Sequence, residues 1–442
     1  MKKIQYKRGI ILNLLSRLFK VEENGSSIRT ELLAGITTFL TMAYILIVNP
    51  MILGDAGMDM GAVFTATALA SAAATFVMAF AANLPISLAP GMGLNAFFAY
   101  TVVIGMGFSW EMALAAVFIE GLIFIGLSVM NVREAIVNAI PLNVKRAVSV
   151  GIGLFIAFIG LENAGIIVPY DGALVQLGDM TAAEPALAMI GLFIVGALLA
   201  LKIKGALILG ILGATLIGIP MGLTTIPNTS FIPPSLAPTF AAFDFSNLFT
   251  MDMLIVLFTF LFVDIFDTAG TLVGVTTKAG MLKEDGSIPK AKQALLADSV
   301  GTTLGALFGT STVTSYIESA SGITEGGRTG LTSATTGLLF LAALFLSPIF
   351  LMVPAAATAS ALVVVGLFMV SPIKEINFDD YTESIPAFLA IIMMPLAYSI
   401  SDGIVFGIFS YVILKSLTGR YKEVSKIAYA LSVIFLLWFI VG

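Results

Sequence analysis

The sequence predicts an all-α polytopic membrane protein in which fourteen transmembrane segments form two inverted repeats of seven. Two observations predict this fold class. Hydrophobic residues make up 58% of the 442 residues and charged residues only 11%, whereas soluble proteins average about 25% charged residues. Lys and Arg are also missing from residues 30–132, 147–201 and 205–277, and gather in short clusters between apolar segments. Such clusters mark the cytoplasmic loops of membrane proteins.

A transmembrane helix needs roughly 20 predominantly apolar residues. Seven such segments are predicted in the first half of the chain, near residues 32–52, 62–82, 85–106, 110–130, 144–162, 186–202 and 204–221. Residues 222–247 are rich in Pro, Thr and Ser and carry no Lys or Arg, which favours an external linker. Seven more segments follow near residues 252–276, 292–309, 311–325, 330–350, 355–371, 383–400 and 402–416.

Counting crossings from a cytoplasmic N-terminus places all 22 Lys and Arg residues on one side of the membrane. Beyond the N-terminal region, the clusters follow even-numbered segments: Arg133, Lys145 and Arg146; Lys202 and Lys204; Lys278, Lys283, Lys290 and Lys292; Arg328; Lys374; and Lys415, Arg420, Lys422 and Lys426. We therefore expect a multi-pass protein of the plasma membrane with its N-terminus in the cytoplasm.

The predicted organisation has five parts. Residues 1–29 form a basic, amphipathic cytoplasmic N-terminus, 30–221 the first repeat, 222–250 the external linker, 251–418 the second repeat and 419–442 a C-terminal tail with an apolar helix. Residues 427–441 of the tail fit either an extra span or an interfacial helix, and the sequence does not decide between them. It equally leaves open whether the protein forms a homodimer.

Because seven is an odd number of crossings, the second repeat must lie inverted relative to the first. Inverted repeats are a common transporter architecture, with the site near the midplane where helices are broken. Breaks occur in the third segment of each half, at residues 84–95 and 309–322, where Pro, Ser or β-branched residues precede small ones. The breaks are predicted to pair as short strands and to direct two helix N-termini at one ligand.

Acidic side chains inside predicted segments cost about 2.5–3.5 kcal/mol each on insertion scales, so each needs a reason. The five are Glu120, Asp264, Asp267, Asp298 and Glu318. Asp267 and Glu318 are the strongest candidates for contacting a polar ligand and carrying protons, and Asp264 is a third candidate for proton coupling. For Asp267 and Glu318 the alternative is a structural hydrogen bond to exposed backbone near a broken helix. For Glu120 we favour a structural role as a polar group in helix packing.

Further substrate-binding candidates lie at the breaks or beside these acids. Asn95 presents a donor and an acceptor, which suits a heterocycle with mixed hydrogen-bonding edges, although helix capping explains it equally well. The remaining candidates are Ala89, Gly91, Phe266, Thr268 and Ser319.

Several function classes are disfavoured. The chain contains neither Cys nor His, which removes thiolate nucleophiles, imidazole proton shuttles and the commonest metal ligands, and no paired catalytic motif suggests an enzyme. It has no P-loop of its own for ATP, and its net charge gives no indication of nucleic-acid binding. Transport driven by an ion gradient is expected, with H⁺ as the coupling ion, Na⁺ not excluded, and no cofactor.

Four stretches resemble the azaguanine-like purine permeases, the adenine/guanine/hypoxanthine branch of the nucleobase transporter superfamily: residues 29–45, 89–95, 264–270 and 315–322. The resemblance implies a core domain of segments 1–4 and 8–11 that moves against a gate domain. It also implies proton-coupled uptake of purine bases, with Asp267, Glu318 and Asn95 as the residues that hold the base. Many relatives have Asn directly after the acid of segment 10, whereas here Ser319 follows Glu318, which weakens any transfer of uracil or xanthine contacts.

Two alternatives remain open at this stage. An anion permease of the sulfate type has the same architecture, but a dianion site should prefer Lys or Arg to two carboxylates. A cation channel lined by acids would suit broken helices, yet it would conduct without accumulating substrate.

Overall fold

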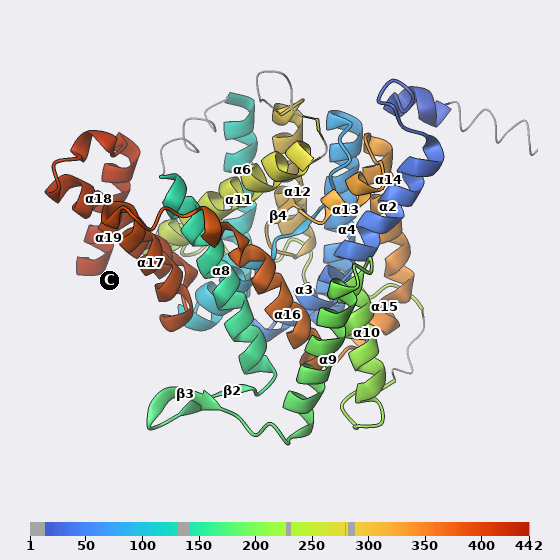
Figure 1. Ribbon diagram of the computed structural model, residues 1–442, viewed down its shortest axis with the longest axis horizontal. Helices are drawn as coiled ribbons and strands as arrows, with labels where there is room; N and C mark the ends of the chain where they lie inside the picture. Colours follow the sequence, from blue (N-terminus) through green and yellow to red (C-terminus); the bar gives the residue numbers. More distant parts are fainter. Residues whose placement is uncertain (1–13, 131–140, 227–230, 279, 282–287, 442) are drawn as a thin grey trace, which may run out of the picture.

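The computed structural model describes residues 14–130, 141–226, 231–278, 280–281 and 288–441. Within these ranges, nine helices are long and apolar enough to cross a membrane, and three shorter apolar helices accompany them at Met92–Gly105, Ala206–Gly218 and Tyr381–Leu396. These helices form the tilted bundle in Figure 1, together with the helix Ala291–Phe308 and the short helix Ser319–Thr324. The predicted fold class is confirmed.

The first repeat consists of short and long helices in the predicted order. Its elements are α2 (Ile28–Met42), α3 (Ile45–Asp55), α4 (Met60–Val77) with the π-helical extension η1 (Met78–Ala82), β1 (Leu88–Pro90), α5 (Met92–Ala96) continuing as the π-helix η2 (Phe97–Gly105), α6 (Trp110–Met130), α8 (Leu142–Asn163), the hairpin β2 (Ile167–Tyr170) and β3 (Ala173–Leu177), α9 (Ala183–Ala200) and α10 (Ala206–Gly218).

The second repeat follows the long linker and ends in an additional helix. Its elements are α11 (Met251–Lys278), α12 (Ala291–Phe308), β4 (Val313–Ser315), α13 (Ser319–Thr324), α14 (Gly330–Ala343), η3 (Leu344–Leu346), α15 (Ser347–Leu351), α16 (Ala355–Val370), η4 (Ser371–Glu375), α17 (Tyr381–Leu396), α18 (Ile400–Leu417), η5 (Tyr421–Glu423) and α19 (Lys426–Val441).

Polar side chains fix where several helices begin. Ser27 and Asp59 accept backbone N–H bonds at the starts of α2 and α4, at 3.2 and 2.7 Å, which satisfies N–H groups that have no partner within the helix. Glu31 is fully buried and accepts bonds from the N–H of Arg328 at 2.9 Å and of Thr329 at 3.2 Å. Segment 1 is thereby fastened to the start of segment 11.

Segment 1 forms one span over Ile28–Asp55, which confirms the span predicted near residues 32–52. Within it, a turn at Ala43 and Tyr44, which the sequence did not predict, separates α2 from α3. The turn lies inside an apolar run with no Gly or Pro at that point, so the sequence carries no helix-breaking signal there. Its consequence is that Tyr44 is carried into the centre of the bundle, where its side chain is buried.

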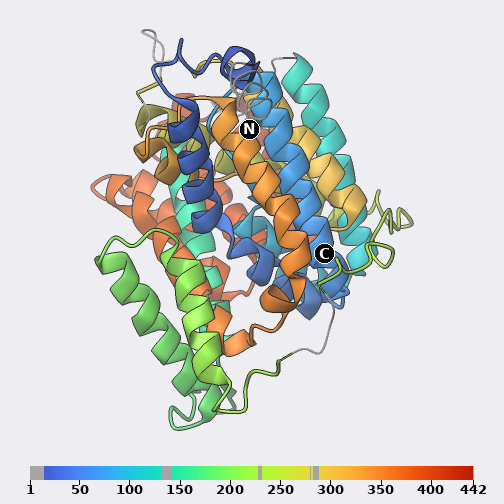
Figure 2. The same cartoon turned by 90° about the vertical axis from the view of Figure 1, so that its right-hand side faces the viewer.

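The helices fall into two groups (Figure 1). One group, which we call the core, contains α2–α6 and α11–α15; the other, the gate, contains α8–α10 and α16–α18. In the core, α2, α4 and α14 lie side by side (Figure 2). In the gate, α8 packs against both α16 and α17. The end of the bundle that carries Arg146, Arg328 and Arg420 is called the basic face below, and the other end the opposite face.

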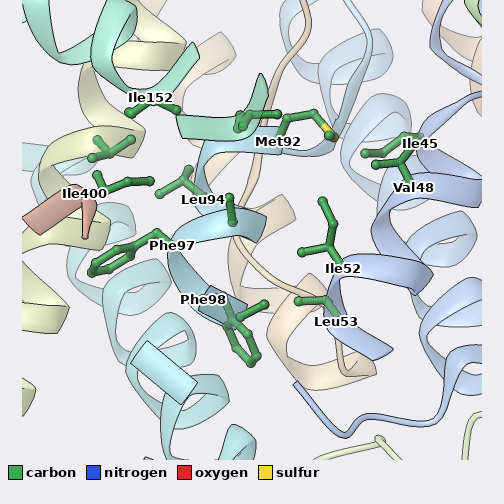
Figure 3. Close-up of a cluster of buried hydrophobic side chains, with 14 of the residues drawn as sticks. Ile45, Val48, Ile52, Leu53, Met92, Leu94, Phe97, Phe98, Ile152 and Ile400 are labelled. Carbon is green, nitrogen blue, oxygen red and sulfur yellow. The ribbon is translucent and has the colours of Figure 1, made fainter. Parts of the chain in front are cut away.

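An apolar seam joins the two groups around segment 3. Leu94 and Phe97 of the core lie beside Ile152 of α8 and Ile400 of α18 (Figure 3), and all four side chains are buried. Phe97 also meets Phe260 of α11 edge to face, with ring centroids 4.8 Å apart. Apolar contacts of this kind are non-directional, so they permit sliding between the groups better than a hydrogen-bonded interface would.

The tail helix α19 returns alongside α18. Ala428 and Leu431 are buried, and the hydroxyl groups of Ser416 and Tyr429 lie 2.9 Å apart. The sequence left open whether this helix spans the membrane or lies at its interface, and packing against α18 is compatible with either.

Close helix packing in the gate depends on small residues. A Cβ atom at Gly153 of α8 would lie 2.6 Å from the carbonyl oxygen of Gly366 in α16. We expect Gly153→Ala to destabilise the folded protein by about 1–3 kcal/mol, because overpacking forces backbone shifts. The measurement is thermal unfolding in detergent. Gly196→Ala in α9, where nothing lies within 4 Å of the new methyl group, serves as the control and should leave the midpoint unchanged or raise it slightly.

Candidate functional site

Two short strands, β1 and β4, pair at the centre of the core, and we call this pair the strand crossing. β1 and β4 pair antiparallel, with Ala89 opposite Thr314 at the middle of the register. The pairing is extended at both ends, since the N–H of Gly91 donates to the carbonyl of Thr312 at 2.9 Å and that of Tyr316 to the carbonyl of Ser87 at 3.0 Å. The predicted pairing of the two breaks is confirmed.

Each strand leads directly into a helix. Gly91 precedes α5, where a Cβ atom would lie 3.0 Å from the side chain of Thr314 on the neighbouring strand. Glu318 precedes α13, which has only six residues. Its first N–H groups are used within the protein, since those of Ser319, Ala320 and Ser321 donate to the carbonyls of Tyr316, Ile317 and Glu318 at 3.2, 3.0 and 2.9 Å.

Glu318 is held from segment 1. The hydroxyl of Tyr44 donates to Oε1 of Glu318 at 2.9 Å, and the hydroxyl of Thr41 lies 3.5 Å from the Glu318 carbonyl. Next to it, the hydroxyl of Ser319 accepts a hydrogen bond from the N–H of Ser87 at 3.0 Å. The carboxyl group therefore has a fixed orientation. Our site prediction missed Tyr44, because only the unpredicted turn in segment 1 brings it there.

Glu318 also lies in the wall of a cavity of about 240 Å³ between core and gate. Thr41 and Ser321 line it on the core side, and Leu199, Lys202 and Phe368 are among its gate residues. At about 30 Å³ for each water molecule, this is room for about eight waters or one small planar molecule. The cavity reaches the basic face, beside the ion pair between Lys204 of the gate and Glu325 of the core.

Asp267 of α11 lies beside β4. Its carboxyl group is within hydrogen-bonding reach of the Thr314 side chain, and it is near enough to Glu318 for the two charges to interact. The ring of Tyr316 lies near both acids, and its hydroxyl donates to the carbonyl of Pro90 at 2.5 Å. The structure thus places Asp267 and Glu318 near each other beside the paired strands.

Asn95 is used within the protein. It is fully buried, and its Oδ1 accepts a hydrogen bond from the hydroxyl of Ser311, at the start of segment 10. Neither of our two interpretations included this contact, which links the two breaks to each other. Phe266 follows Ile265 on α11, and its side chain lies outside the described residues.

Thr268 and Asp264 lie in a separate buried cluster behind β4. The Thr268 hydroxyl donates to Asp298 at 2.7 Å and lies 3.3 Å from Asp264. Glu120 accepts from Thr312 at 2.8 Å, and Asp298 also accepts from Ser315 at 3.3 Å. Two hydroxyl groups therefore connect the cluster to the strand: Ser315 belongs to β4, and Thr312 directly precedes it. Thr268 contacts the buried carboxyl groups of Asp264 and Asp298.

A larger hollow, about 480 Å³, lies elsewhere on the basic face. It is lined by Asp380, Glu383, Arg420 and Glu423 at the ends of α17 and α18. Its charges are already paired: the buried Lys415 contacts Glu383 at 2.8 Å and Glu423 at 2.7 Å, and Arg420 contacts Asp380 at 2.5 Å. We interpret it as a structural ion network that fastens α18 to α17.

This network has a defined pH dependence. Hydrogen bonds from Arg420 hold the pKa of Asp380 far below its usual range and, with those from Lys415, lower the pKa of Glu423 to about 2. Because the folded-state pKa values are depressed, the stabilisation is complete above about pH 4–5 and is lost as the pH falls toward 2. Arg420→Gln should lower the midpoint of thermal unfolding at pH 7, and the deficit should shrink between pH 5 and pH 3. The exposed Lys422, changed to Gln, is the control; a deficit independent of pH would contradict the assignment.

Residues 29–406 match the Permease family. The chain belongs to this family. The adenine permease AdeP of Escherichia coli (strain K12) is 44% identical over 96% of this chain and 95% of its own length. The guanine/hypoxanthine permease PbuG of Bacillus subtilis (strain 168) is 48% identical, over 96% and 99% respectively. The resemblance to the purine branch is confirmed, and this permease is a transporter rather than an enzyme.

Solved structures share the fold of this permease at low sequence identity. The transmembrane domain of the cyanobacterial bicarbonate transporter BicA is 16% identical, with a TM-score of 0.65, covering 86% of this chain and 97% of its own. The anion transporter Slc26a9 of the mouse, in its inward-facing state, is 12% identical, with a TM-score of 0.65 over 88% and 68% of the two chains. This likeness supports the architecture of two repeats with core and gate.

Proposed function

We propose that this permease takes up the purine bases adenine, guanine and hypoxanthine together with protons, by alternating access, across the plasma membrane. The observation that carries the proposal is the position of Glu318. Its carboxyl group is oriented by Tyr44 and lies in the wall of a cavity between two groups of helices. The relatives named above are an adenine permease and a guanine/hypoxanthine permease, which supports purines as the substrate.

A purine base fits such a site chemically. Its edges carry N–H donors, and a carboxylate has two oxygens that accept them. The short helix α5 starts beside the paired strands, and the first N–H groups of a helix, which have no partner within it, would donate to ring nitrogens or a carbonyl oxygen. Base and carboxylate would then form charge-assisted hydrogen bonds inside the protein, where such bonds are stronger than in water.

Proton coupling is proposed from the acids at the crossing. Asp267 and Glu318 carry charges that interact, so a proton bound to one lowers the cost of holding the other inside the membrane. Asp264, in the neighbouring buried cluster, is a third carrier. A proton that enters with a neutral base moves one charge, and each 100 mV of membrane potential then contributes about 2.3 kcal/mol to accumulation.

An anion permease is less well supported by the site. The cavity wall at the strand crossing presents the carboxyl group of Glu318, which repels an anion. Lys202 and Lys204 lie at the rim, and Lys204 is paired with Glu325. The likeness to bicarbonate and anion transporters extends to the fold alone.

Uptake of radiolabelled adenine, guanine, hypoxanthine, xanthine and uracil tests this function in cells that lack their own purine carriers, with and without a protonophore. We expect accumulation of at least one of the first three bases and its loss on adding the protonophore. Uptake that is insensitive to the protonophore would refute proton coupling, and conductance without accumulation would indicate a channel. Absence of uptake for every base would refute the substrate class.

The proposed orientation has its own test. The chain contains no Cys, so a single Cys reports one position cleanly. Leu174 in the β2–β3 hairpin is 84% exposed, and L174C is expected to react with a membrane-impermeant maleimide added to intact cells. K422C, on the basic face, should react only after the cells are permeabilised. The reverse pattern would show that the N-terminus faces outward.

A further inference from the structure

The two ends of the seam between core and gate are built differently. At the basic face, the cavity beside Glu318 is open, and the ion pair between Lys204 and Glu325 bridges its rim. The side chains of that pair are 52% and 32% exposed, and half-exposed ion pairs contribute little to stability. At the opposite face, the seam is crossed instead by a chain of hydrogen bonds.

This chain centres on Tyr100. The residue lies in η2 of the core, is 4% exposed, and donates its hydroxyl proton to Asp55 at the end of α3 at 2.7 Å. The same oxygen accepts a hydrogen bond from Nδ2 of Asn163, at the end of α8 in the gate, at 3.2 Å. One phenol group thus uses both its donor and its acceptor capacity, and the second bond crosses from core to gate.

Aromatic rings close the same point from the gate side. Tyr398, between α17 and α18, meets Tyr100 edge to face with ring centroids 6.3 Å apart. It is held by Phe155 of α8, at 5.3 Å between centroids, and it donates to Glu162 at 3.0 Å. The ring of Tyr398 is therefore held in place by the gate and packs against Tyr100 of the core.

The backbone at Tyr398 is set by the end of α17. Its φ is 54°, the left-handed conformation common just past a helix C-terminus, and the N–H of Ser399 donates to the carbonyl of Met394 at 3.1 Å. Contacts of the ring with Phe155 and Tyr100 hold the side chain at this turn.

Below the tyrosines, the path to the strand crossing is apolar. Leu94 and Phe97 lie beside Ile152 and Ile400 (Figure 3), and the hydroxyl of Thr101 lies 3.5 Å from the N–H of Ile400. In this conformation the seam is closed at the opposite face, while the cavity beside Glu318 reaches the basic face.

We propose that Asp55, Tyr100 and Asn163, together with the ring of Tyr398, form the outer gate of this permease. The inference rests on the proposed function for its direction of transport. For a substrate to enter from the opposite face, the bond from Asn163 to Tyr100 must break and the two rings must separate. The contact is small and polar, so it can form and break repeatedly, whereas the apolar layer beneath it excludes water when closed.

The first test needs no substrate. The buried Thr101 is changed to Cys in the naturally Cys-free chain, and its reaction rate with a maleimide is measured on purified protein with and without Tyr100→Phe. Tyr100→Phe removes both hydrogen bonds of the hydroxyl, but only the one from Asn163 crosses from core to gate. Loss of that one bond shifts the closed–open equilibrium by about fivefold, and the labelling rate should rise accordingly. Asn163→Ala, which removes the bond from the gate side, should have the same effect. Unchanged rates in both variants would overturn the proposal, whatever the substrate proves to be.

The second test links core and gate covalently at the proposed outer gate. In Y100C/Y398C, a bifunctional thiol reagent should bridge core and gate and abolish uptake, and cleaving the linker should restore it. The control F76C/F80C places both thiols within the core, in α4 and η1, where the rings are 6.3 Å apart, so bridging should leave uptake unchanged. Full uptake by the bridged Y100C/Y398C protein would overturn the proposed outer gate. If none of the variants transported any purine before bridging, that result would count against the proposed function instead.

Discussion

Glu318→Gln is expected to abolish accumulation of the purine base while leaving the protein folded and in the membrane. The substitution keeps the shape of the side chain, and the Tyr44 hydroxyl can still donate to the new amide oxygen, as it does to Oε1 at 2.9 Å. What is lost is the negative charge and one acceptor. A hydrogen bond to a charged group contributes about 1.5–3 kcal/mol, so the affinity for the base should fall by roughly 10- to 150-fold. Under the proposed coupling, the variant also loses the carboxyl group that would carry a proton.

Two measurements separate these effects. Binding of radiolabelled base to the purified protein gives the loss of affinity, and uptake into cells at saturating base gives the loss of coupling. Glu325→Gln is the matched control, because Glu325 is seven residues away in the same segment and forms the half-exposed ion pair with Lys204. It should reduce uptake by less than about fivefold, in line with at most about 1 kcal/mol for such a pair. Wild-type accumulation by E318Q would contradict the site.

Tyr44 shows why part of the site was hidden in the sequence. The strand crossing was predictable, because Pro, Ser and β-branched residues interrupt two segments at corresponding places. The turn at Ala43 and Tyr44 has no such signal; packing of the core imposes it, and local propensity is a weak prior against tertiary contacts. A site residue carried by such a turn cannot be found from residue spacing alone.

Helix periodicity explains the separation between Asp267 and Thr268. Successive residues of an α-helix point about 100° apart, so residues four apart share a face and neighbours do not. Asp264 and Thr268 accordingly meet in the buried cluster behind β4, while Asp267 is directed to Thr314. Thr268 is a predicted substrate contact, and its hydroxyl is used by Asp264 and Asp298 in this structure. The helical period therefore gives Thr268 and Asp267 different neighbours although they are adjacent in sequence.

Contacts between helix ends were beyond the sequence. The chain from Asp55 through Tyr100 to Asn163 joins the ends of α3 and α8 to the middle of η2. Asp55 and Asn163 are ordinary polar residues at helix ends, and Tyr100 lies within a helix. Their meeting depends on how the gate packs against the core, and residue spacing within a segment carries no information about that packing.

Asp267→Asn is expected to uncouple transport from the proton gradient with a smaller effect on binding than Glu318→Gln. The amide oxygen of Asn can still accept the hydrogen bond from Thr314 on β4, so the strand crossing keeps its support. The amide cannot take up a proton, and it removes the charge that interacts with Glu318. With one proton for each base, 100 mV of driving force corresponds to about 2.3 kcal/mol, or about 50-fold accumulation. D267N should therefore equilibrate the base across the membrane at a ratio near one.

Counterflow provides the decisive measurement, since exchange of labelled for unlabelled base requires binding and movement of the gate but no proton gradient. D267N reconstituted in vesicles should retain exchange and lose accumulation driven by a pH step. Asp244→Asn is the control, because this exposed carboxyl group caps a turn through the N–H of Ser246 at 2.9 Å in the linker, away from the strand crossing. Loss of exchange along with accumulation would assign Asp267 to binding of the base, and retained accumulation would remove it from the coupling mechanism.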